Sequence, residues 1–595
     1  MPSLITLAGT VTGLLVGLGQ SAPSLRSDLK PRLTSCNTAS DRACWVTGYT
    51  IDTDYEADTP YTGVTRTFNW TLEEITSWTA PDGEVKTSAM LINGEYPGPT
   101  ITADWGDTIE VTVNNNLNYN GTSIHWHGLR QLGNNIQDGV NGVTECPLAP
   151  GASKTYTFNL TQYGTTWYHS HYSAQYANGV FGAIVINGPA SANYDIDLGA
   201  YPINDFYVDS ADEIVEETRS TPAPPSSNNV FFNGTNINPS GSGGAYSTID
   251  LTPGSVHLLR LYNPSAEHNY EISIVGHNMT VIETDLVPVE PVTVDYLFLA
   301  IGQRANVLIN ATATAGNYWM NVTLPSTNLC GASDNPYPAA ILHYTSAESG
   351  NPTDQGTTPF NPGCQDSLSY VPVVSRTADL DDFAQTASNT FDISDVTSPT
   401  VLWYVNSSSI DVDWEYPVVS YVMSGNTSYP TDENIVTVSE TDVWTYWIIE
   451  NASAVPHPLH LHGHDFLVLG VSAESAGDFT SSDIDSLNVD NPTRRDVTML
   501  PALGWVVLAF KSDNPGAWLF HCHIAWHVSG GLALDFLERP DDQAAQITTA
   551  EKTAYKDNCA TWDSYWNDAD LTKIDSGLKK FKARELPEQF LPKRV

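Results

Sequence analysis

Four His-x-His pairs constrain this 595-residue chain more than any other feature of its sequence. In a β-strand, alternate side chains point to the same face, so each pair can aim two imidazoles at one place. Imidazole is a ligand for copper, zinc, iron and nickel. One pair alone is weak evidence, but four pairs in a chain with only 15 histidines predict a cluster that holds several metal ions. The pairs are His125/His127, His169/His171, His460/His462 and His521/His523.

The last pair encloses a cysteine, in the sequence His521-Cys522-His523. If this segment begins as a strand, Cys522 points away from the two histidines beside it. One side would then serve the cluster, and the other would offer a thiolate to a second metal. His527 and His457 could complete a site of two histidines and one cysteine, which is the composition of blue copper. The backbone at Cys522 would then form a covalent path for electrons between the two sites.

Short β-rich segments bounded by Gly, Pro and Asn dominate the chain, for example 108–113 and 183–186. They predict an all-β fold of antiparallel sandwiches or barrels. The phrase His125-Trp-His-Gly near the N-terminus is echoed by His460-Leu-His-Gly near the C-terminus, which suggests a duplicated sandwich with metal sites on the outer copies. The tail 551–580 carries more helix formers and is expected to be partly helical.

Carboxylates dominate the charge, with 68 Asp and Glu against 25 Lys and Arg and a formal net charge of -43. A surface this negative is poorly suited to nucleic acid or anionic lipid, so neither is expected as a partner. It suits a protein that works in acidic surroundings, where many carboxylates protonate, and it suits simple solubility equally well.

The segment 1–22 combines a short apolar run with small residues and is interpreted as a signal peptide. The segment 23–34 is a candidate propeptide, because basic residues precede the first cysteine. No later segment reaches the ~18 apolar residues of a membrane helix, so no membrane partner is expected and the protein is predicted to be secreted and extracellular. Sequons for N-glycosylation support export. They lie at Asn69, Asn120, Asn159, Asn233, Asn278, Asn310, Asn321, Asn406, Asn426 and Asn451.

The chain has seven cysteines, so at least one must be free. Cys522 is the natural choice, because histidines flank it on both sides. The other six can form three disulfides, and the spacing alone leaves all fifteen pairings open. These six are Cys36, Cys44, Cys146, Cys330, Cys364 and Cys559.

These motifs resemble those of the multicopper oxidases, and most of all the laccases of ascomycete fungi, over nearly the whole chain. The motifs are His125-Trp-His-Gly, His169-Ser-His, His457-Pro-Leu-His-Leu-His and His521-Cys-His-Ile-Ala-Trp-His. The resemblance implies three cupredoxin-like Greek-key β-sandwich or barrel domains, with a cluster between the first and third. Their expected limits are 35–188, 189–365 and 366–578, followed by an extension at 579–595.

The resemblance also implies four copper ions as cofactors, namely one type 1, one type 2 and two type 3 ions. The ligands would be His457, Cys522 and His527 for type 1, His125 and His460 for type 2, and His127, His169, His171, His462, His521 and His523 for the type 3 pair. His464 shares the alternation of this region, but the family motif treats it as a non-ligand.

Three further residues take roles from the resemblance. Leu532 falls at the axial position of the type 1 copper, where a leucine offers no donor and should favour Cu(I); otherwise it is a core leucine. Asp138 resembles an aspartate near the type 2 copper that helps deliver protons, and its alternative is a turn residue. Glu267 resembles the acidic residue of the phenol pocket, where it can accept the phenolic proton. The alternative for Glu267 is a solvated surface glutamate.

The resemblance implies the disulfides Cys36–Cys44, Cys146–Cys559 and Cys330–Cys364. It also makes the segment 575–578 a processing site, so that cleavage after Leu578 would remove the extension 579–595. The new end would then plug the channel to the copper cluster. The alternative is a disordered basic tail without function.

The implied activity is that of a laccase, acting as a monomer. Phenols or aromatic amines, including lignin-derived phenols, would give up single electrons at the type 1 copper, and O2 would be reduced to water at the other three. The alternatives are another multicopper oxidase that acts on ferrous ion, ascorbate or bilirubin, and a non-catalytic copper-binding cupredoxin. A ferroxidase should have carboxylates around the type 1 histidines. A cupredoxin carrier needs only the His2Cys site, so the eight-histidine cluster argues against it.

Overall fold

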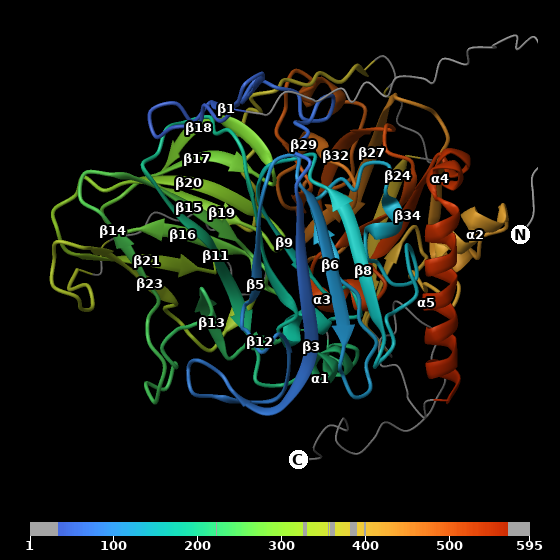
Figure 1. Cartoon of the computed structure of the whole chain (residues 1–595), viewed down its shortest axis with the longest axis horizontal. Helices are drawn as coiled ribbons and strands as arrows, with labels where there is room; N and C mark the ends of the chain where they lie inside the picture. The colour runs from blue at the N-terminus through green and yellow to red at the C-terminus, as the bar shows by residue number, and fades with distance from the viewer. Residues whose placement is uncertain are drawn as a thin grey trace, which may run out of the picture.

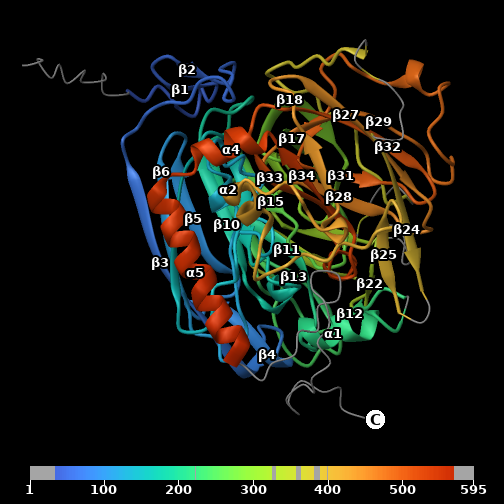
Figure 2. The same cartoon turned by 90° about the vertical axis from the view of Figure 1, so that its right-hand side faces the viewer.

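The computed structural model describes residues 34–221, 223–324, 330–354, 356, 363–380, 383, 389–397 and 400–568. Its strands form three sandwiches of two sheets each, which follow one another along the chain (Figures 1 and 2). The all-β prediction is confirmed. The predicted signal peptide, the processing site and the extension 579–595 lie outside the described residues. Among the helices of the described part, none is both long and apolar enough to cross a bilayer.

The first sandwich follows a short hairpin of β1 (Cys44–Val46) and β2 (Tyr49–Thr50). Its strands are β3 (Thr65–Thr79), β4 (Val85–Ile92), β5 (Gly98–Asp104), β6 (Thr108–Asn115), β7 (His125–His127), β8 (Ser153–Asn159), β9 (Gly164–His169) and β10 (Phe181–Asn187). The sheet orders are β4-β3-β6-β8 and β5-β10-β9-β7. In β6, Ile109, Val111 and Val113 are buried and the residues between them are half-buried, which is the alternation that gives a strand one core face.

The second sandwich has sheet orders that share no strand with the first, and a two-residue pair of β12 (Ser226–Ser227) with β22 (Ala332–Ser333) lies beside it. One sheet comprises β13 (Asn229–Phe232), β11 (Ile196–Phe206), β15 (Val256–Tyr262), β20 (Arg304–Asn310), β17 (Met279–Thr284) and β18 (Val287–Val294), in that order. The other comprises β14 (Thr248–Leu251), β23 (Ala339–Tyr344), β21 (Asn317–Thr323), β16 (Tyr270–Ile274) and β19 (Tyr296–Leu299).

The third sandwich is built in the same way. One sheet comprises β25 (Leu402–Val405), β24 (Thr390–Val396), β27 (Trp444–Asn451), β32 (Trp505–Lys511), β29 (Phe466–Val471) and β30 (Arg494–Arg495). The other comprises β26 (Ile435–Val438), β34 (Ala533–Glu538), β33 (Gly516–Cys522), β28 (His457–Leu461) and β31 (Val497–Leu500). The helices are α1 (Ala211–Thr218), α2 (Val418–Ser424), α3 (Ala525–Ser529), α4 (Pro540–Gln546) and α5 (Thr549–Asp568).

The sheets are mixed: most strand pairs are antiparallel, as expected, but some are parallel. Each sandwich contains two parallel strand pairs in equivalent places. The pairs are β3/β6 and β5/β10, β11/β15 and β14/β23, and β24/β27 and β26/β34. Alternation within a strand reveals which face is buried, but it carries no information about the direction of a partner that lies far away in the chain.

The sequence similarity predicted between the two outer sandwiches is also seen in their strand pairing, because equivalent histidines lie opposite each other in both. In the first sandwich His125 of β7 lies opposite His169 of β9, and in the third His460 of β28 lies opposite His521 of β33. Antiparallel pairing therefore brings the second His-x-His pair of each outer sandwich next to the first. One hydrophobic cluster joins all three sandwiches, with Trp167 from the first, Tyr262 from the second and Trp518 from the third. A common core of this kind holds the two histidine-bearing sandwiches in a fixed relation.

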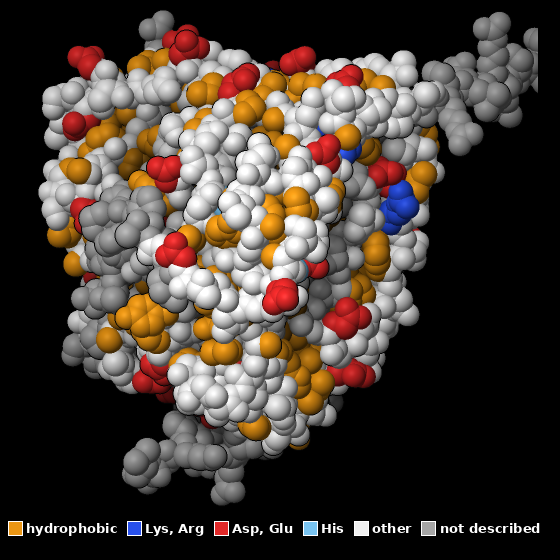
Figure 3. All heavy atoms as spheres, turned by 90° about the vertical axis from the view of Figure 1, so that its left-hand side faces the viewer, with side chains coloured by type: hydrophobic (Ala, Val, Ile, Leu, Met, Phe, Trp, Pro, Cys, Tyr) orange, Lys and Arg blue, Asp and Glu red, His pale blue; other side chains and the backbone are white. Residues whose placement is uncertain are grey.

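Figure 3 shows the face over the second sandwich, where Asp and Glu side chains are scattered and Lys or Arg are few. This distribution agrees with the formal net charge of -43. The carboxylates are spread over the surface and do not form one patch, so they provide solubility without marking a binding site on this face.

Helix α5 confirms the predicted helical tail. It runs along the outside of the first sandwich near β8 (Figures 1 and 2). Trp562 of this helix is fully buried, and its ring contacts the rings of Trp414 and Tyr172. The disulfide Cys146–Cys559 ties the helix to the first sandwich, and the other disulfides are Cys36–Cys44 and Cys330–Cys364. These are the pairs that the resemblance implies.

Removal of the Cys146–Cys559 disulfide by the double substitution to Ser should lower the stability by about 2–4 kcal/mol, because the bond closes a loop of 413 residues. Thermal unfolding followed by circular dichroism measures this loss. The matched control is the Cys36–Cys44 pair, which spans only 8 residues and should cost less. A larger loss in the control would contradict the prediction.

Candidate metal centres

Cys522 is the one free cysteine of the described residues, and it lies buried at the end of β33. Its Sγ is 3.6 Å from Nδ1 of His457 and 3.6 Å from Nδ1 of His527, and these two nitrogens are 3.2 Å apart. His457 begins β28, whereas His527 lies in α3, which begins three residues after Cys522. A thiol and two imidazoles within ligand distance of one shared point can hold one metal ion.

Leu532 is joined to this group through the backbone. The amide of Cys522 donates to the carbonyl of Leu532 at 3.1 Å, and the amide of Leu532 donates to the carbonyl of His527 at 3.0 Å. The side chain is buried in the same hydrophobic cluster as Cys522. On the other side, the ring of Trp403 lies 4.0 Å from the ring of His527. The His2Cys group therefore lies in apolar surroundings.

The eight histidines of the four pairs meet in one buried cluster between the first and third sandwiches. Residues from β7, β9, β28 and β33 and from the turns that follow these strands supply them. Three sets have ligand atoms within 4.8 Å of one another: His127, His169 and His523; His171, His462 and His521; and His125, His127 and His460. The sets share members, but together they offer enough ligand atoms for more than one metal ion.

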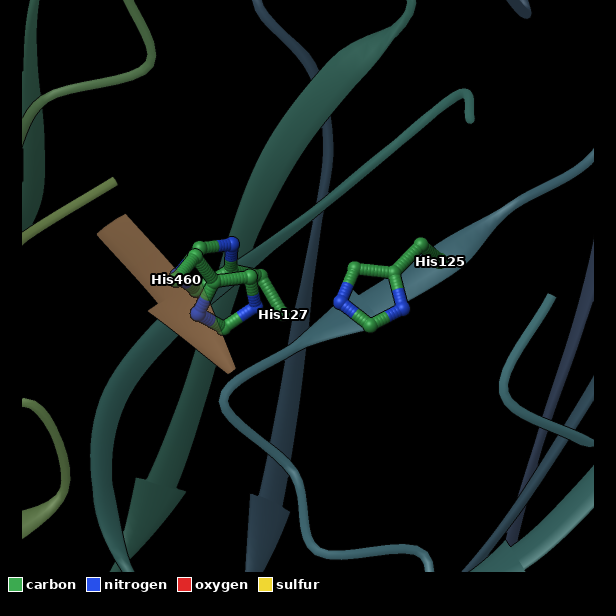
Figure 4. Close-up of side chains that lie close together, drawn as sticks. All are labelled: His125, His127 and His460. Carbon is green, nitrogen blue, oxygen red and sulfur yellow. The ribbon is translucent and has the colours of Figure 1, made fainter. Parts of the chain in front are cut away.

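Contacts across the cluster join residues that are far apart in the chain. Nε2 of His462 is 3.2 Å from Nε2 of His521, and Nε2 of His523 is 3.3 Å from Nδ1 of His127. The rings of His127 and His460 stack at 3.9 Å with 12° between their planes. Figure 4 shows this stack, with the third labelled histidine beside it on the same strand as His127. The four strands thus aim their imidazoles inward at one volume.

Hydrogen-bond acceptors orient the rings from outside. Nδ1 of His125 is 2.8 Å from the carbonyl oxygen of Asp138, and Nδ1 of His462 is 2.8 Å from Oδ2 of the same residue. Nδ1 of His460 is 2.8 Å from the carbonyl oxygen of Asp496. A carbonyl oxygen can only accept, so the proton of His125 and of His460 lies on Nδ1 and Nε2 is left for a metal.

Asp496 also links the cluster to the second sandwich. Both of its carboxylate oxygens accept from the guanidinium of Arg304 at 2.6 Å, and Oδ1 lies 3.3 Å from Nε2 of His127. Arg304 begins β20, and its side chain is also 3.3 Å from Asp285. All these groups are buried. Residues of all three sandwiches therefore meet in a group of buried charges around Asp496, next to the histidine cluster.

The donor set fits copper. Nε2 of His125, His169 and His460 are buried without a hydrogen-bond partner among the described residues, a costly arrangement that a metal ion would relieve. Burial lowers the pKa of His457 to about 3 and of His521 to about 4, so these imidazoles are neutral, as metal binding requires. A site of two histidines and one thiolate beside a histidine cluster matches the preference of copper.

A cavity lies beside His527, and Glu267 reaches it from the second sandwich. Glu267 is buried, which excludes the alternative of a solvated surface residue. Burial, followed by the nearby carboxylate of Asp205, raises the pKa of Glu267 well above its usual value. Asp395 adds a second carboxyl group to the lining. The walls are mainly apolar and include Val215, Val401, Trp403 and Val455.

His464 lies near the cluster without facing it. Its Nε2 is 2.9 Å from Oε2 of Glu538, and its ring packs against Phe510 and Trp518. The sequence reasoning missed Asp496, Arg304, Trp403 and Asp205. For Asp496 a signal exists in the charged run 494–496, which directly precedes the β-rich segment 497–500. The other three come from distant segments, and no spacing in the sequence connects them with the histidines.

Comparison with known proteins shows the family to which the chain belongs. Family models of the multicopper oxidases match residues 75–191, 199–347 and 395–542. The chain is 53% identical to a laccase of Melanocarpus albomyces over 580 residues, covering 95% of this chain and 93% of that protein. The structure of a laccase from Botrytis aclada matches 91% of this chain and 100% of its own, with a TM-score of 0.84 and 40% identity. Fet3p, a multicopper oxidase that functions in iron import, matches 83% of this chain and 95% of its own with a TM-score of 0.74 and 25% identity.

The chain therefore belongs to the multicopper oxidase family. Within that family, its relatives place it among the laccases of ascomycete fungi, so the predicted enzyme class is confirmed. Family membership also implies that the metal is copper.

Replacement of Arg304 by Met should lower the free energy of unfolding by about 3–5 kcal/mol, because it leaves a carboxylate buried without its cation. Denaturant unfolding followed by tryptophan fluorescence measures the change. Lys511→Met is the control, since it removes an ion pair with Asp442 that is largely exposed and should cost less than about 1 kcal/mol. Equal losses in the two variants would show that the Arg304 contact contributes no more than a surface pair.

Proposed function

We propose that this chain is a four-copper laccase that oxidises phenols and aromatic amines in one-electron steps and passes the electrons to O2. The contact of Cys522 with His457 and His527, beside a separate histidine cluster, carries the proposal. We assign the type 1 copper to these three residues. We assign the type 2 copper to His125 and His460, and the type 3 pair to His127, His169, His171, His462, His521 and His523.

When bound, the coppers supply one-electron acceptance at the first site and four-electron reduction of O2 at the cluster. The chain supplies the connection between the two. Cys522 belongs to the His2Cys group, while its neighbours His521 and His523 belong to the cluster. A few covalent bonds therefore separate the site where electrons enter from the site where they are used. Leu532 offers no donor to the first site, which should favour the reduced ion and help to oxidise poor reductants.

The cavity beside His527 is where the reductant docks under this proposal. Its apolar walls suit an aromatic ring, and Glu267 supplies a buried carboxyl group at the same place. A phenol becomes a far better electron donor as it loses its proton. The Glu267 carboxylate can accept that proton, because its raised pKa makes it a stronger base than an exposed glutamate.

Reduction of O2 to water consumes protons at the cluster. Asp138 is buried, and one carboxylate oxygen lies 2.8 Å from Nδ1 of His462 while the other lies 3.3 Å from Nδ1 of His125. It is therefore the acidic group that we propose for proton delivery, and it orients two of the ligands as well. The proposal also includes secretion after removal of 1–22 and action as a monomer. Its domain limits are 35–188, 189–365 and 366–578, and the extension 579–595 is lost.

Another multicopper oxidase activity remains the second candidate. A ferroxidase should place carboxylates near the type 1 histidines, and both Glu267 and Asp395 line the cavity beside His527. Two observations favour a phenol over ferrous ion. The walls around these groups are mainly apolar, and Arg219 adds a positive charge to the lining, whereas a hydrated cation requires ionised oxygen ligands.

Oxygen uptake by protein purified from culture medium tests the proposal. We expect turnover with a methoxyphenol to exceed turnover with ferrous ion or ascorbate by at least about tenfold in kcat/KM, because only the phenol uses the apolar walls and the carboxyl group together. Faster oxidation of ferrous ion than of any phenol would overturn the laccase assignment. Absence of the protein from the medium would overturn the proposed secretion.

Cys522→Ser should remove one copper of four and abolish the blue absorption, because a serine hydroxyl cannot replace the soft thiolate. Metal analysis by mass spectrometry and a visible spectrum measure both effects. His343→Gln is the control, since that histidine contacts Asn317 in the second sandwich and lies in none of the metal groups of the described residues. Retention of the blue band in Cys522→Ser would contradict the type 1 assignment.

A further inference from the structure

We infer that Asp205 is a positioning residue that holds the Glu267 carboxyl group in the cavity, an inference that rests on the proposed role of Glu267 in phenol oxidation. Asp205 lies near the C-terminal end of β11 and is buried. Its Oδ1 accepts from the amide of Ala266 at 2.9 Å, and its Oδ2 accepts from the amide of Glu267 at 2.8 Å. Two successive amides of the loop between β15 and β16 are thus bound by one carboxylate.

Two further hydrogen bonds, one to the carboxylate and one from the backbone amide, hold Asp205 in place. The hydroxyl of Tyr207 donates to Oδ2 at 3.2 Å, and the amide of Asp205 donates to Oγ of Ser265 at 3.1 Å. Ser265 belongs to the same loop as Glu267. Hydrogen bonds to an ionised acceptor are about twice as strong as those between neutral groups. Asp205 therefore fixes the loop more firmly than a neutral residue of the same shape.

The opposite side of the loop is bound to the helix that carries His527. The amide of Ala525, the first residue of α3, donates to the carbonyl of Ala266 at 2.9 Å. The peptide that leads into Glu267 is therefore held between β11 and α3. This arrangement fixes the distance between the carboxyl group and the helix that bears His527, which a proton acceptor needs if it is to meet the same bound phenol.

Burial and charge agree with this geometry. Glu267 lines the cavity beside His527, and the nearby side chain of Trp526 partly offsets the rise in the pKa of Glu267. The carboxylate of Asp205 also raises the pKa of Glu267, in the same direction as burial. Asp205 itself does not line the cavity, so it acts on the substrate only through the loop.

The test compares two reductants in four variants of the holoenzyme. One reductant is a methoxyphenol, which must lose a proton, and the other is hexacyanoferrate(II), which has none to lose. Asp205→Asn should lower kcat/KM for the phenol about tenfold to a hundredfold, mainly in kcat, because an amide has only one acceptor oxygen for two N–H donors. The blue absorption and the rate with hexacyanoferrate(II) should stay unchanged. Asp197→Asn is the matched control, since it lies on the same strand but pairs with Arg260, outside the cavity lining.

Glu267→Gln separates the inference from the proposed function. If Glu267→Gln leaves the ratio of the two rates unchanged, the proposed proton acceptor is wrong. If that variant lowers the ratio and Asp205→Asn does not, the positioning role is wrong. The double variant should be no slower with the phenol than Glu267→Gln alone, because Asp205 acts through the carboxyl group that is already lost.

An equal loss with both reductants, or a weakened blue band, would overturn the inference in favour of a general support for the fold. Tyr207→Phe serves if Asp205→Asn does not fold, because it removes one donor and leaves both loop amides bound. It should lower the phenol rate about threefold and spare the rate with hexacyanoferrate(II). An unchanged ratio in Tyr207→Phe would then count against the inference.

Discussion

The alternation of side chains at the end of β33 is the constraint on which the rest of this structure depends. Successive side chains of a strand point to opposite faces, so Cys522 and its neighbours His521 and His523 must serve different sites. The thiol meets His457 and His527, and the flanking imidazoles enter the cluster. Three consecutive residues therefore belong to two different groups of candidate ligands. Under the proposed function, the connection for electrons between the two sites therefore follows from the alternation of side chains along one β-strand.

The cluster depends on the docking of separate sandwiches. Half of its eight histidines come from the first sandwich and half from the third, so neither sandwich forms it alone. Asp138 of the first sandwich contacts His462 of the third, and Asp496 of the third lies beside His127 of the first. The ion pair between Arg304 and Asp496 connects the second sandwich to the third. These buried charges are costly unless all partners are present, so they tie the assembly of the sandwiches to the formation of the site.

Most of the candidate metal ligands could be predicted from the sequence, because they occur in short motifs. Four pairs of histidines and one enclosed cysteine identify the ligands by type and spacing alone. Strand alternation was equally readable, as β6 illustrates with Ile109, Val111 and Val113. The direction of strand pairing was not, and the mixed sheets differ from the antiparallel sandwiches expected. Asp205 and Trp403 could not be predicted either, since each comes from a segment more than 50 residues away from the site residues that it contacts.

The sequence by itself therefore determined the ligand inventory, the strand faces and the odd cysteine, because these follow from local geometry and residue chemistry. Only the tertiary structure decided which imidazoles lie together, which acceptors orient them and which carboxyl groups lie in the cavity beside His527. Those choices arise from long-range packing between sandwiches, where contacts join residues hundreds of positions apart. The sequence pattern shows which side chains each segment contains. The shared core and the buried charges determine which residues of other segments those side chains contact.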